Sequence, residues 1–345
     1  MTKLLSEELF THCAGSLAAI SLAVLAVSRP ASAAPAAMVY WENSSSNKSF
    51  AVEIGQIQQL ATDTWSVDAT GKLTGVAPTA ELKFAAKHHI QSFATISNFG
   101  ITDFDPAIVH AILTNPLARS KMFAGMSSVA TINGYDGINI DFESVSPADR
   151  GLFTKFVNVA SAYLHARGKY LVLSVPAMLQ NDPTDSWTGA YDLAALSRAV
   201  DIVQYMTYDE NGPWGTPGPV AGLDWVSAAA HYAISVVPPA KISLGVPAYG
   251  YDWNLTAGTG SQVPWNQIPA LLSTNQAAPL WDAASSSPYF NYTLGGDQHV
   301  VWYENYTSIE RKAALASAMK LAGVSVYALG YEDPNFWAAL KQGGQ

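Results

Sequence analysis

The segment from Gly134 to Glu143 reads Gly-Tyr-Asp-Gly-Ile-Asn-Ile-Asp-Phe-Glu and ends on two carboxylates. In a strand, Asn139, Asp141 and Glu143 would point to one face, about 6 to 7 Å apart along the chain, and the apolar residues between them to the other. Cleavage of a glycosidic bond needs a carboxylic acid that keeps its proton near working pH, and burial beside a second carboxylate raises a carboxyl pKa. Glu143 is therefore the candidate acid.

Two other interpretations of this segment remain open. A carboxylate pair at the end of a strand is often only an ion-pair or capping site, although Gly137 and the regular apolar alternation favour a functional face. Asp136, Asp141 and Glu143 could instead bind a magnesium ion in a metal-dependent barrel enzyme. No phosphate-binding glycine-rich loop accompanies them in the sequence.

Composition limits the classes of protein to which the chain can belong. It has 345 residues, of which 49% are apolar and 13% charged, so it can bury a large core. The net charge is −9, and the 18 lysines and arginines are scattered along the chain, which argues against a nucleic acid partner. These features favour a soluble enzyme with a neutral substrate. We also expect the protein to be a monomer and to need no metal or other cofactor.

The amino-terminal part predicts export. Residues 14–28 are apolar and small, and Ala31-Ser32-Ala33 follows as a cleavage site, so residues 1–33 are predicted to be a secretory signal. The alternative is a retained membrane anchor, for which the apolar run is short. After cleavage the chain would be secreted to the extracellular space or cell wall, free of the membrane. The single cysteine, Cys13, lies in this leader, which excludes a cysteine nucleophile from the mature chain.

Residues 34–345 are predicted to form one α/β domain, a (β/α)8 TIM barrel. Short β-branched or aromatic runs alternate with longer stretches of helical period, such as 79–88, 147–167, 222–236 and 308–321. Eight such runs are expected as strands: 38–43, 63–68, 92–98, 136–143, 170–176, 201–209, 241–247 and 324–330.

One interval departs from this alternation. Residues 249–300 are rich in Gly, Ser, Asn, Trp and Tyr and have no long helical period. A structureless loop of that length is uncommon in a compact domain. The interval therefore predicts a small α+β insertion between the seventh and eighth barrel strands.

Unusual polar residues gather where the predicted strands end. Asn98 ends the third strand, Asp141 and Glu143 the fourth, and Tyr208 and Asp209 the sixth. Barrel enzymes carry their active sites at the carboxyl ends of the strands. These residues are therefore expected to meet in one site.

Four motifs in this order resemble glycoside hydrolase family 18, the chitinase family, over residues 38–340. Asp136-Gly-Ile-Asn139-Ile-Asp141-Phe-Glu143 resembles its D-x-x-D-x-D-x-E signature, and Met206-Thr-Tyr208-Asp209 its M-x-Y-D motif. Trp302-Tyr-Glu304 and the strand 323–330 also match. Asn139, the residues after Met206 and Gly218-Pro-Val are similar to the bacterial spore-cortex and cell-wall branch.

The resemblance implies a substrate-assisted retaining mechanism, in which the substrate's own N-acetyl carbonyl attacks the anomeric carbon. Glu143 would protonate the glycosidic oxygen and then act as base on water, and Asp141 would orient the acetamido group. Tyr208 would bind the acetamido oxygen, with Asp209 contacting sugar, and Asp136 would support the strand from below. The candidate substrate-binding residues are Gln204, Met206, Asp209, Tyr327, Tyr40, Asn98 and Trp225.

Two residues depart from the family pattern. Asn139 stands where many chitinases have aspartate, and a change in rate or pH dependence is expected from it. Tyr327 stands where a tryptophan commonly lies under the sugar. Other tryptophans can stack on sugars or merely pack: Trp41, Trp187, Trp214, Trp225, Trp253 and Trp265.

The expected partner is a polysaccharide that contains N-acetylglucosamine. Chitin and peptidoglycan both remain open as that polysaccharide. The rival function is a catalytically silent sugar-binding protein on the same barrel, against which the intact Glu143, Asp141 and Tyr208 argue.

Overall fold

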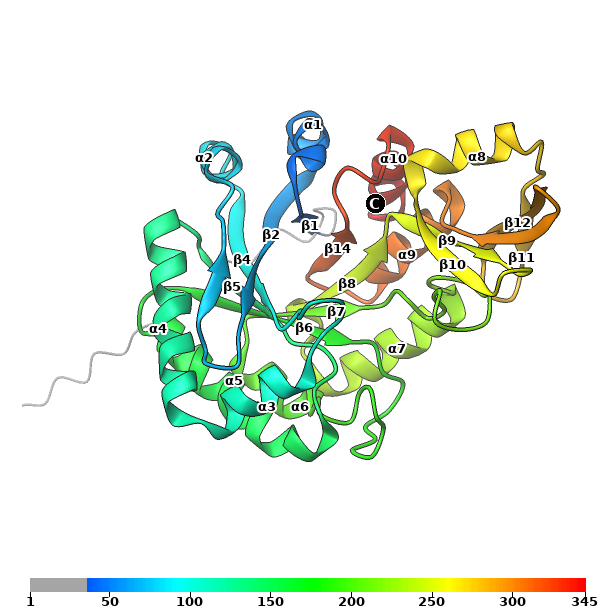
Figure 1. Cartoon of the computed structure of the whole chain (residues 1–345). Coiled ribbons are helices and arrows are strands. Elements are labelled where there is room, and N and C mark those ends of the chain that lie inside the picture. Colours follow the sequence, from blue (N-terminus) through cyan, green and yellow to red (C-terminus); the bar gives the residue numbers. More distant parts are fainter. Residues whose placement is uncertain (1–35) are drawn as a thin grey trace, which may run out of the picture. The chain divides into compact units, whose positions relative to one another are not determined.

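The computed structural model describes residues 36–345, so the predicted leader and Cys13 lie outside the described residues. Eight parallel strands form the centre of the fold (Figure 1). They are β1 (Ala36–Trp41), β2 (Ile57–Val67), β4 (Gln91–Ser97), β5 (Gly137–Asp141), β6 (Tyr170–Pro176), β7 (Ile202–Met206), β8 (Ile242–Pro247) and β14 (Gly323–Tyr327). A short strand, β3 (Leu73–Gly75), pairs antiparallel with the end of β2.

The sheet closes on itself because β1 pairs in parallel with both β14 and β2. Between them the hydrogen-bonded order is β14, β8, β7, β6, β5, β4, β2, which is the (β/α)8 barrel expected from the sequence. Inward side chains fill the barrel: Met38, Ala61, Phe93, Val172 and Ala328 are all buried in one cluster. The barrel is thus a packed core whose upper end is left for a site.

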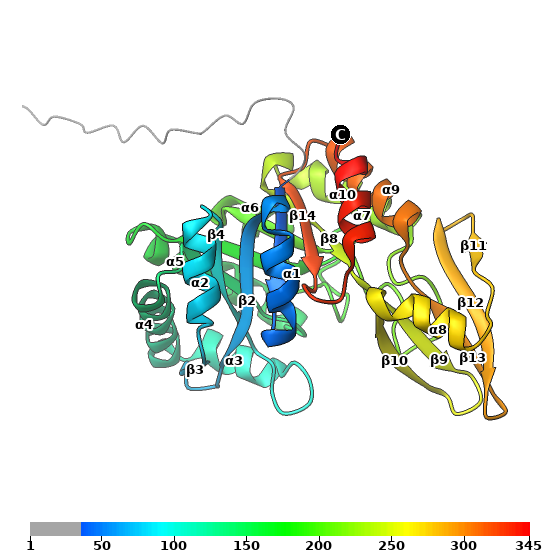
Figure 2. The ribbon, with the colours of Figure 1, turned by 90° about the horizontal axis from the view of Figure 1, so that it is seen from above.

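Helices surround the strands, as Figure 2 shows from above. They are α1 (Asn47–Val52), α2 (Thr79–Lys87), α3 (Pro106–Thr114), α4 (Pro116–Asn133), α5 (Arg150–His165), α6 (Leu193–Ala199), α7 (Leu223–Val236), α9 (Tyr306–Ala318) and α10 (Pro334–Gly343). Ile138, Ile140 and Phe142 are fully buried in the layer between strands and helices. Phe142 stacks on Phe153 and Phe156 of α5, with ring centroids 6.5 and 5.9 Å away.

The second strand begins at Ile57, six residues before the predicted start at Asp63. Gln58 and Gln59 are polar residues near the start of this strand, and their side-chain amides form hydrogen bonds with neighbouring strands at the amino end of the barrel. Gln58 Oε1 accepts from the Ala37 backbone N–H at 2.7 Å, and Gln59 donates to Gln91 at 3.0 Å. Strand β5 ends at Asp141, so Glu143 lies just beyond it.

The predicted insertion is present as an antiparallel sheet with the strand order β10-β9-β13-β12-β11, beside a short helix. Its elements are β9 (Tyr249–Asn254), β10 (Thr259–Pro264), α8 (Ile268–Thr274), β11 (Leu280–Asp282), β12 (Ser287–Leu294) and β13 (Asp297–Trp302). Val263, Ile268, Phe290 and Val301 form its small core. The insertion lies between β8 and β14, as expected. Among residues 36–345, no helix combines the length and apolar character that crossing a bilayer requires.

Candidate active site

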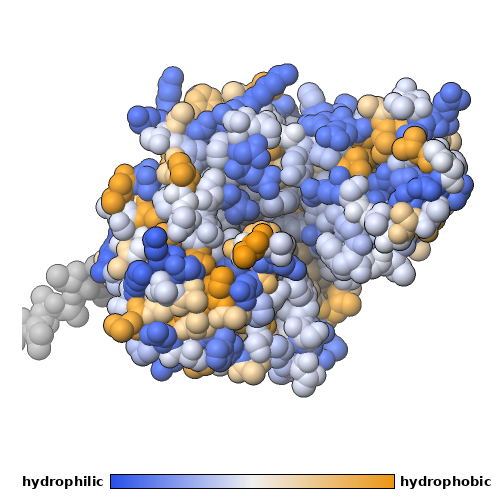
Figure 3. Space-filling model, in the orientation of Figure 1, coloured by the Kyte–Doolittle hydropathy of each residue, from blue (hydrophilic) through white to orange (hydrophobic). Residues whose placement is uncertain are grey.

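A cleft of about 980 Å³ opens at the carboxyl ends of the barrel strands and extends to the insertion. Figure 3 shows this face of the molecule hollowed near the middle of the view. The residues that line the cleft include seven carboxyl groups and no lysine, arginine or histidine. The carboxyl groups belong to Glu42, Asp63, Asp103, Asp141, Glu143, Asp209 and Glu210.

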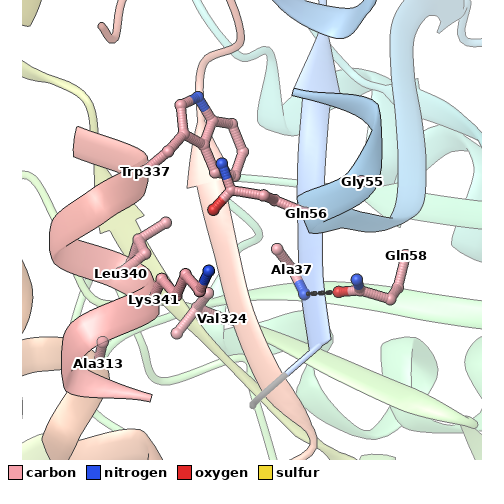
Figure 4. Close-up of a pocket in the computed structure, with 9 residues that line it drawn as sticks. All are labelled: Ala37, Gly55, Gln56, Gln58, Ala313, Val324, Trp337, Leu340 and Lys341. Carbon is pink, nitrogen blue, oxygen red and sulfur yellow. Dashed lines mark hydrogen bonds between the residues drawn. The ribbon is translucent and has the colours of Figure 1, made fainter. Parts of the chain in front are cut away.

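A second, smaller cavity of about 220 Å³ lies at the opposite end of the barrel (Figure 4). It is bordered by Ala37 and Val324, the second residues of β1 and β14, and by Trp337, Leu340 and Lys341 of α10. No carboxylate lines it. The acid chemistry predicted from the sequence therefore belongs to the large cleft.

Asn98 fixes the main chain of the candidate acid. The Glu143 backbone N–H donates to Asn98 Oδ1 at 2.9 Å, and Asn98 Nδ2 donates to the Glu143 carbonyl at 2.9 Å and to the Asp105 carbonyl at 3.1 Å. Asn98 is fully buried and is not among the residues that line the cleft. The side-chain amide of Asn98 therefore positions the backbone of Glu143. This differs from the expectation that Asn98 contacts the sugar.

Burial and neighbouring charges keep a proton on Glu143. Burial, followed by the charges of Asp141 and Asp209, raises the pKa of the Glu143 carboxyl well above its usual value. Burial also raises the pKa of Asp141 to about 7, with a further rise from Asp63 and an opposing effect of the Ser174 hydroxyl. At neutral pH the protonated form of Glu143 is thus available as an acid.

Asn139 lies beneath Asp141 and is fully buried. Its Nδ2 donates to Tyr40 Oη at 2.9 Å and to Thr95 Oγ1 at 3.4 Å, and its Oδ1 accepts from Ser174 Oγ at 3.2 Å. Tyr40 lines the cleft, and Asn139 does not. The Asn139 amide thus forms its hydrogen bonds with Tyr40, Thr95 and Ser174 and forms none with Asp141. Within residues 36–345, Asp141 Oδ1 is buried without a hydrogen-bond partner.

Strand β7 and the residues that directly follow it supply a second group of predicted site residues. Gln204, Met206, Tyr208 and Asp209 all line the cleft. Gln204 Nε2 donates to Tyr208 Oη at 3.3 Å and to Ser325 Oγ at 3.0 Å. Burial, together with Tyr40 and Asp141, raises the pKa of Tyr208 well above its usual value, so its hydroxyl keeps a proton to donate.

The insertion holds Asp209 in place. Tyr249 and Tyr251 of β9 donate to its Oδ1 at 2.6 and 2.8 Å. The Asp209 backbone has a φ of 60°, in the left-handed region, where aspartate is one of the better-tolerated residues. Sequence reasoning missed both tyrosines, although their alternation in Tyr249-Gly-Tyr251 places them on one face of a strand.

Aromatic rings form one wall of the cleft. Tyr327 lies 6.0 Å from Tyr208 and 5.7 Å from Tyr40 between ring centroids, and its hydroxyl donates to Glu42 Oε1 at 2.7 Å. Glu42 was not anticipated from the sequence. Of the six tryptophans that were left open, three line the cleft and three are buried in packing. The lining ones are Trp187, Trp214 and Trp225, and the packed ones Trp41, Trp253 and Trp265.

Asp136 precedes β5 at the amino end of the barrel, where its Oδ2 accepts from the Ser92 backbone N–H at 2.8 Å. It is separated from Glu143 by the length of the strand, about 3.3 Å per residue. Asp136, Asp141 and Glu143 therefore do not come together as the magnesium alternative requires. In the part of the chain that the structure describes, no group of three or more His, Cys, Asp and Glu side chains is arranged to hold a metal ion.

Comparison with known proteins places this cleft in a family. The model of glycosyl hydrolases family 18 matches residues 36–332, nearly the whole described chain. This chain belongs to glycoside hydrolase family 18. It is a glycoside hydrolase, and the family acts on glycans that contain N-acetylglucosamine.

Relatives within family 18 resemble the chain over most of its length. It is 38% identical to the uncharacterized glycosylase YvbX of Bacillus subtilis over 82% of this chain and 84% of that one. The crystal structure of a chitinase from Chromobacterium violaceum superposes with a TM-score of 0.86 at 38% identity, covering 90% and 99% of the two chains. The cortical fragment-lytic enzyme of Bacillus subtilis is 28% identical over 71% of this chain and 58% of its own.

Proposed function

We propose that this family 18 enzyme hydrolyses β-1,4 bonds next to N-acetylglucosamine with retention, using the substrate's acetamido group as the nucleophile. The observation that carries the proposal is that one cleft holds both a protonated Glu143 and Asp141, whose buried Oδ1 has no hydrogen-bond partner among the described residues. A buried acceptor without a donor is costly, and a substrate amide N–H is a donor of the right kind.

The cleft residues suggest a role for each group. Glu143 protonates the leaving oxygen while Asp141 accepts the acetamido N–H and turns the carbonyl oxygen toward the anomeric carbon. Tyr208, whose oxygen already accepts from Gln204, donates a hydrogen bond to that carbonyl oxygen. The carbonyl oxygen forms a bond to the anomeric carbon as the glycosidic bond breaks, which gives an oxazolinium ion. The Glu143 carboxylate then takes a proton from water, which opens that ion.

The charge of the cleft favours a neutral glycan. Seven carboxyl groups line it without a basic residue, so an anionic substituent would be repelled. Chitin-type oligomers are neutral, whereas the muramyl peptide stems of peptidoglycan carry carboxylates. We therefore propose chitin-type oligomers as the substrate, in keeping with the chain's similarity to the chitinase from Chromobacterium violaceum.

Substrate preference can be measured with purified protein. We expect hydrolysis of N-acetylglucosamine oligomers to exceed hydrolysis of peptidoglycan at least about tenfold, because each 1.4 kcal/mol of lost binding is a factor of ten. Mass spectrometry of the products from both polymers gives the ratio and shows whether cleavage is internal or terminal. Peptidoglycan whose carboxylates have been amidated is the matched control, because it keeps the glycan strand and removes the negative charge. Faster release from intact peptidoglycan would contradict the proposed substrate.

Substrate assistance has its own test. A thiazoline analogue of the oxazolinium ion is expected to inhibit competitively, at a concentration at least about a hundredfold below that of free N-acetylglucosamine, because such analogues mimic the intermediate. Inhibition constants from oligomer hydrolysis provide the comparison. Equal inhibition by the two compounds would rule against an acetamido nucleophile.

A silent sugar-binding protein on the same barrel is the alternative function. It predicts oligomer binding without any release of reducing ends, and the complete set of Glu143, Asp141 and Tyr208 in one cleft speaks against it. We also propose that the enzyme is a monomer and, on the basis of the leader predicted for residues 1–33, that it is secreted.

A further inference from the structure

Asp63 is a carboxyl group inside the barrel for which the mechanism above has no use. It lies on β2, two residues after Ala61 of the inner cluster, and therefore points inward as well. Its Cα pairs with Thr95 on β4, which in turn pairs with Asn139 on β5. Asp63 and Asn139 thus occupy one level of the barrel, two strands apart. Asp63 and Asp141 both line the cleft, and the charge of Asp63 raises the pKa of Asp141.

The Asp63 carboxylate lacks the partners that usually stabilise a buried charge. No hydrogen bond between residues 36 and 345 involves its side chain, and no basic group lines the cleft. The titratable groups that interact with it come from three other parts of the barrel: Tyr40 and Glu42 at β1, Asp141 and Glu143 at β5, and Tyr327 at β14. All of them are neutral or negative.

Asp141 receives no hydrogen bond from Asn139, the inward-facing residue before it on β5. The Asn139 amide already donates to Tyr40 and Thr95 and accepts from Ser174, and Asp141 Oδ1 has no partner in the described chain. Two carboxylates that share a water-poor site cannot both ionise at small cost, so such a pair holds one proton in common. Burial, and then Glu42, raises the pKa of Asp63 to about 6, and burial raises that of Asp141 to about 7.

We propose that Asp63 is a positioning residue that shares one proton with Asp141. In the free enzyme the proton resides on Asp141. When a substrate amide N–H donates to Asp141 Oδ1, the anionic form of Asp141 is favoured and the proton resides on Asp63, so the pair gains no second charge. This inference rests on the proposed role of Asp141 in hydrolysis.

The test is the pH profile of kcat/KM for N-acetylglucosamine oligomers in Asp63→Asn. Without the neighbouring charge the pKa of Asp141 falls, and the acid limb of the profile is expected to move at least about one pH unit toward lower pH. A purely structural role would lower the rate without moving that limb. Asp68→Asn, which makes the same change at an exposed turn after β2, should leave the limb in place.

A double variant distinguishes proton sharing from a general loss of charge. Asp63→Asn combined with Asn139→Asp moves the second carboxyl to β5, beside Asp141, and should return the acid limb toward its wild-type position. If Asp63→Asn does not fold, as judged by circular dichroism, Asp63→Ser removes the same charge. An active, folded variant at Asp63 whose acid limb coincides with that of the wild type would overturn the inference and leave the glycosidase function standing. A wild-type protein inactive on all glycans would instead overturn the function.

Discussion

Glu143→Gln is expected to lower kcat on N-acetylglucosamine oligomers by about a thousandfold or more, because general acid catalysis contributes about 10² to 10⁴ and the proposed mechanism uses this residue in both steps. The substitution keeps the shape of the side chain and removes only the proton that it transfers. The Glu143 backbone is held by Asn98 and is not altered, so the loss belongs to chemistry. Release of reducing ends under saturating substrate measures it.

Binding should survive the same substitution. The dissociation constant of the thiazoline analogue, measured by calorimetry, is expected to stay within a few fold of the wild-type value, because Asp141 and Tyr208 remain in place. Glu310→Gln on α9 is the matched control, since it makes the same chemical change away from the cleft and should keep full activity. A Glu143→Gln enzyme that retained a tenth of the wild-type kcat would show that another group supplies the proton.

The wild-type rate should fall at alkaline pH for the same reason. The pKa of Glu143 is raised, so the residue stays protonated through neutrality and loses its proton only as the pH rises further. Deprotonation removes the acid, and kcat decreases along that limb. The sign follows from the direction of the pKa shift.

The barrel and the centre of the cleft could be predicted from the sequence because both depend on local patterns. Alternating strand and helix periods gave the eight strands, and the period of two on β5 separated Asn139, Asp141 and Glu143 from Ile138 and Ile140. The residues around Met206 were located by their motif. In each case the information lies within a few consecutive residues.

The rest of the cleft depends on closure of the barrel. Asp63 and Glu42 are single acids outside any motif. They reach the neighbourhood of Asp141 only because β1 pairs with β2, β2 with β4 and β4 with β5. Tyr249 and Tyr251 reach Asp209 through a strand of the insertion. The strand pattern predicts Asn98 at the end of a strand, but its hydrogen bonds to Glu143 join two strands and depend on their pairing.

Lys312→Met is expected to lower the free energy of unfolding by about 3 to 5 kcal/mol, which is typical when one partner of a buried ion pair is removed. Lys312 Nζ donates to Glu304 Oε2 at 2.7 Å, and the two side chains are 0% and 1% exposed. Among the described residues Glu304 Oε1 has no partner, so without Lys312 the carboxylate would lose its only cation. Glu304 lies two residues after β13, the last strand of the insertion, and Lys312 lies on α9, so the pair ties the connection that leaves the insertion to a helix of the barrel.

Two further variants decide whether charge is the cause. Asp192→Asn breaks the partly exposed ion pair with Arg150, keeps a side-chain oxygen to cap α6, and should change stability by no more than about 1 kcal/mol. Glu304→Leu combined with Lys312→Met removes both buried charges and should recover most of the stability that the single substitution loses, since an apolar pair of similar size avoids the desolvation of either ion. Urea titrations of the three variants give the free energies. If the double variant were as unstable as Lys312→Met alone, the lysine stem would be stabilising the junction by packing, and the uncompensated charge of Glu304 would not explain the loss.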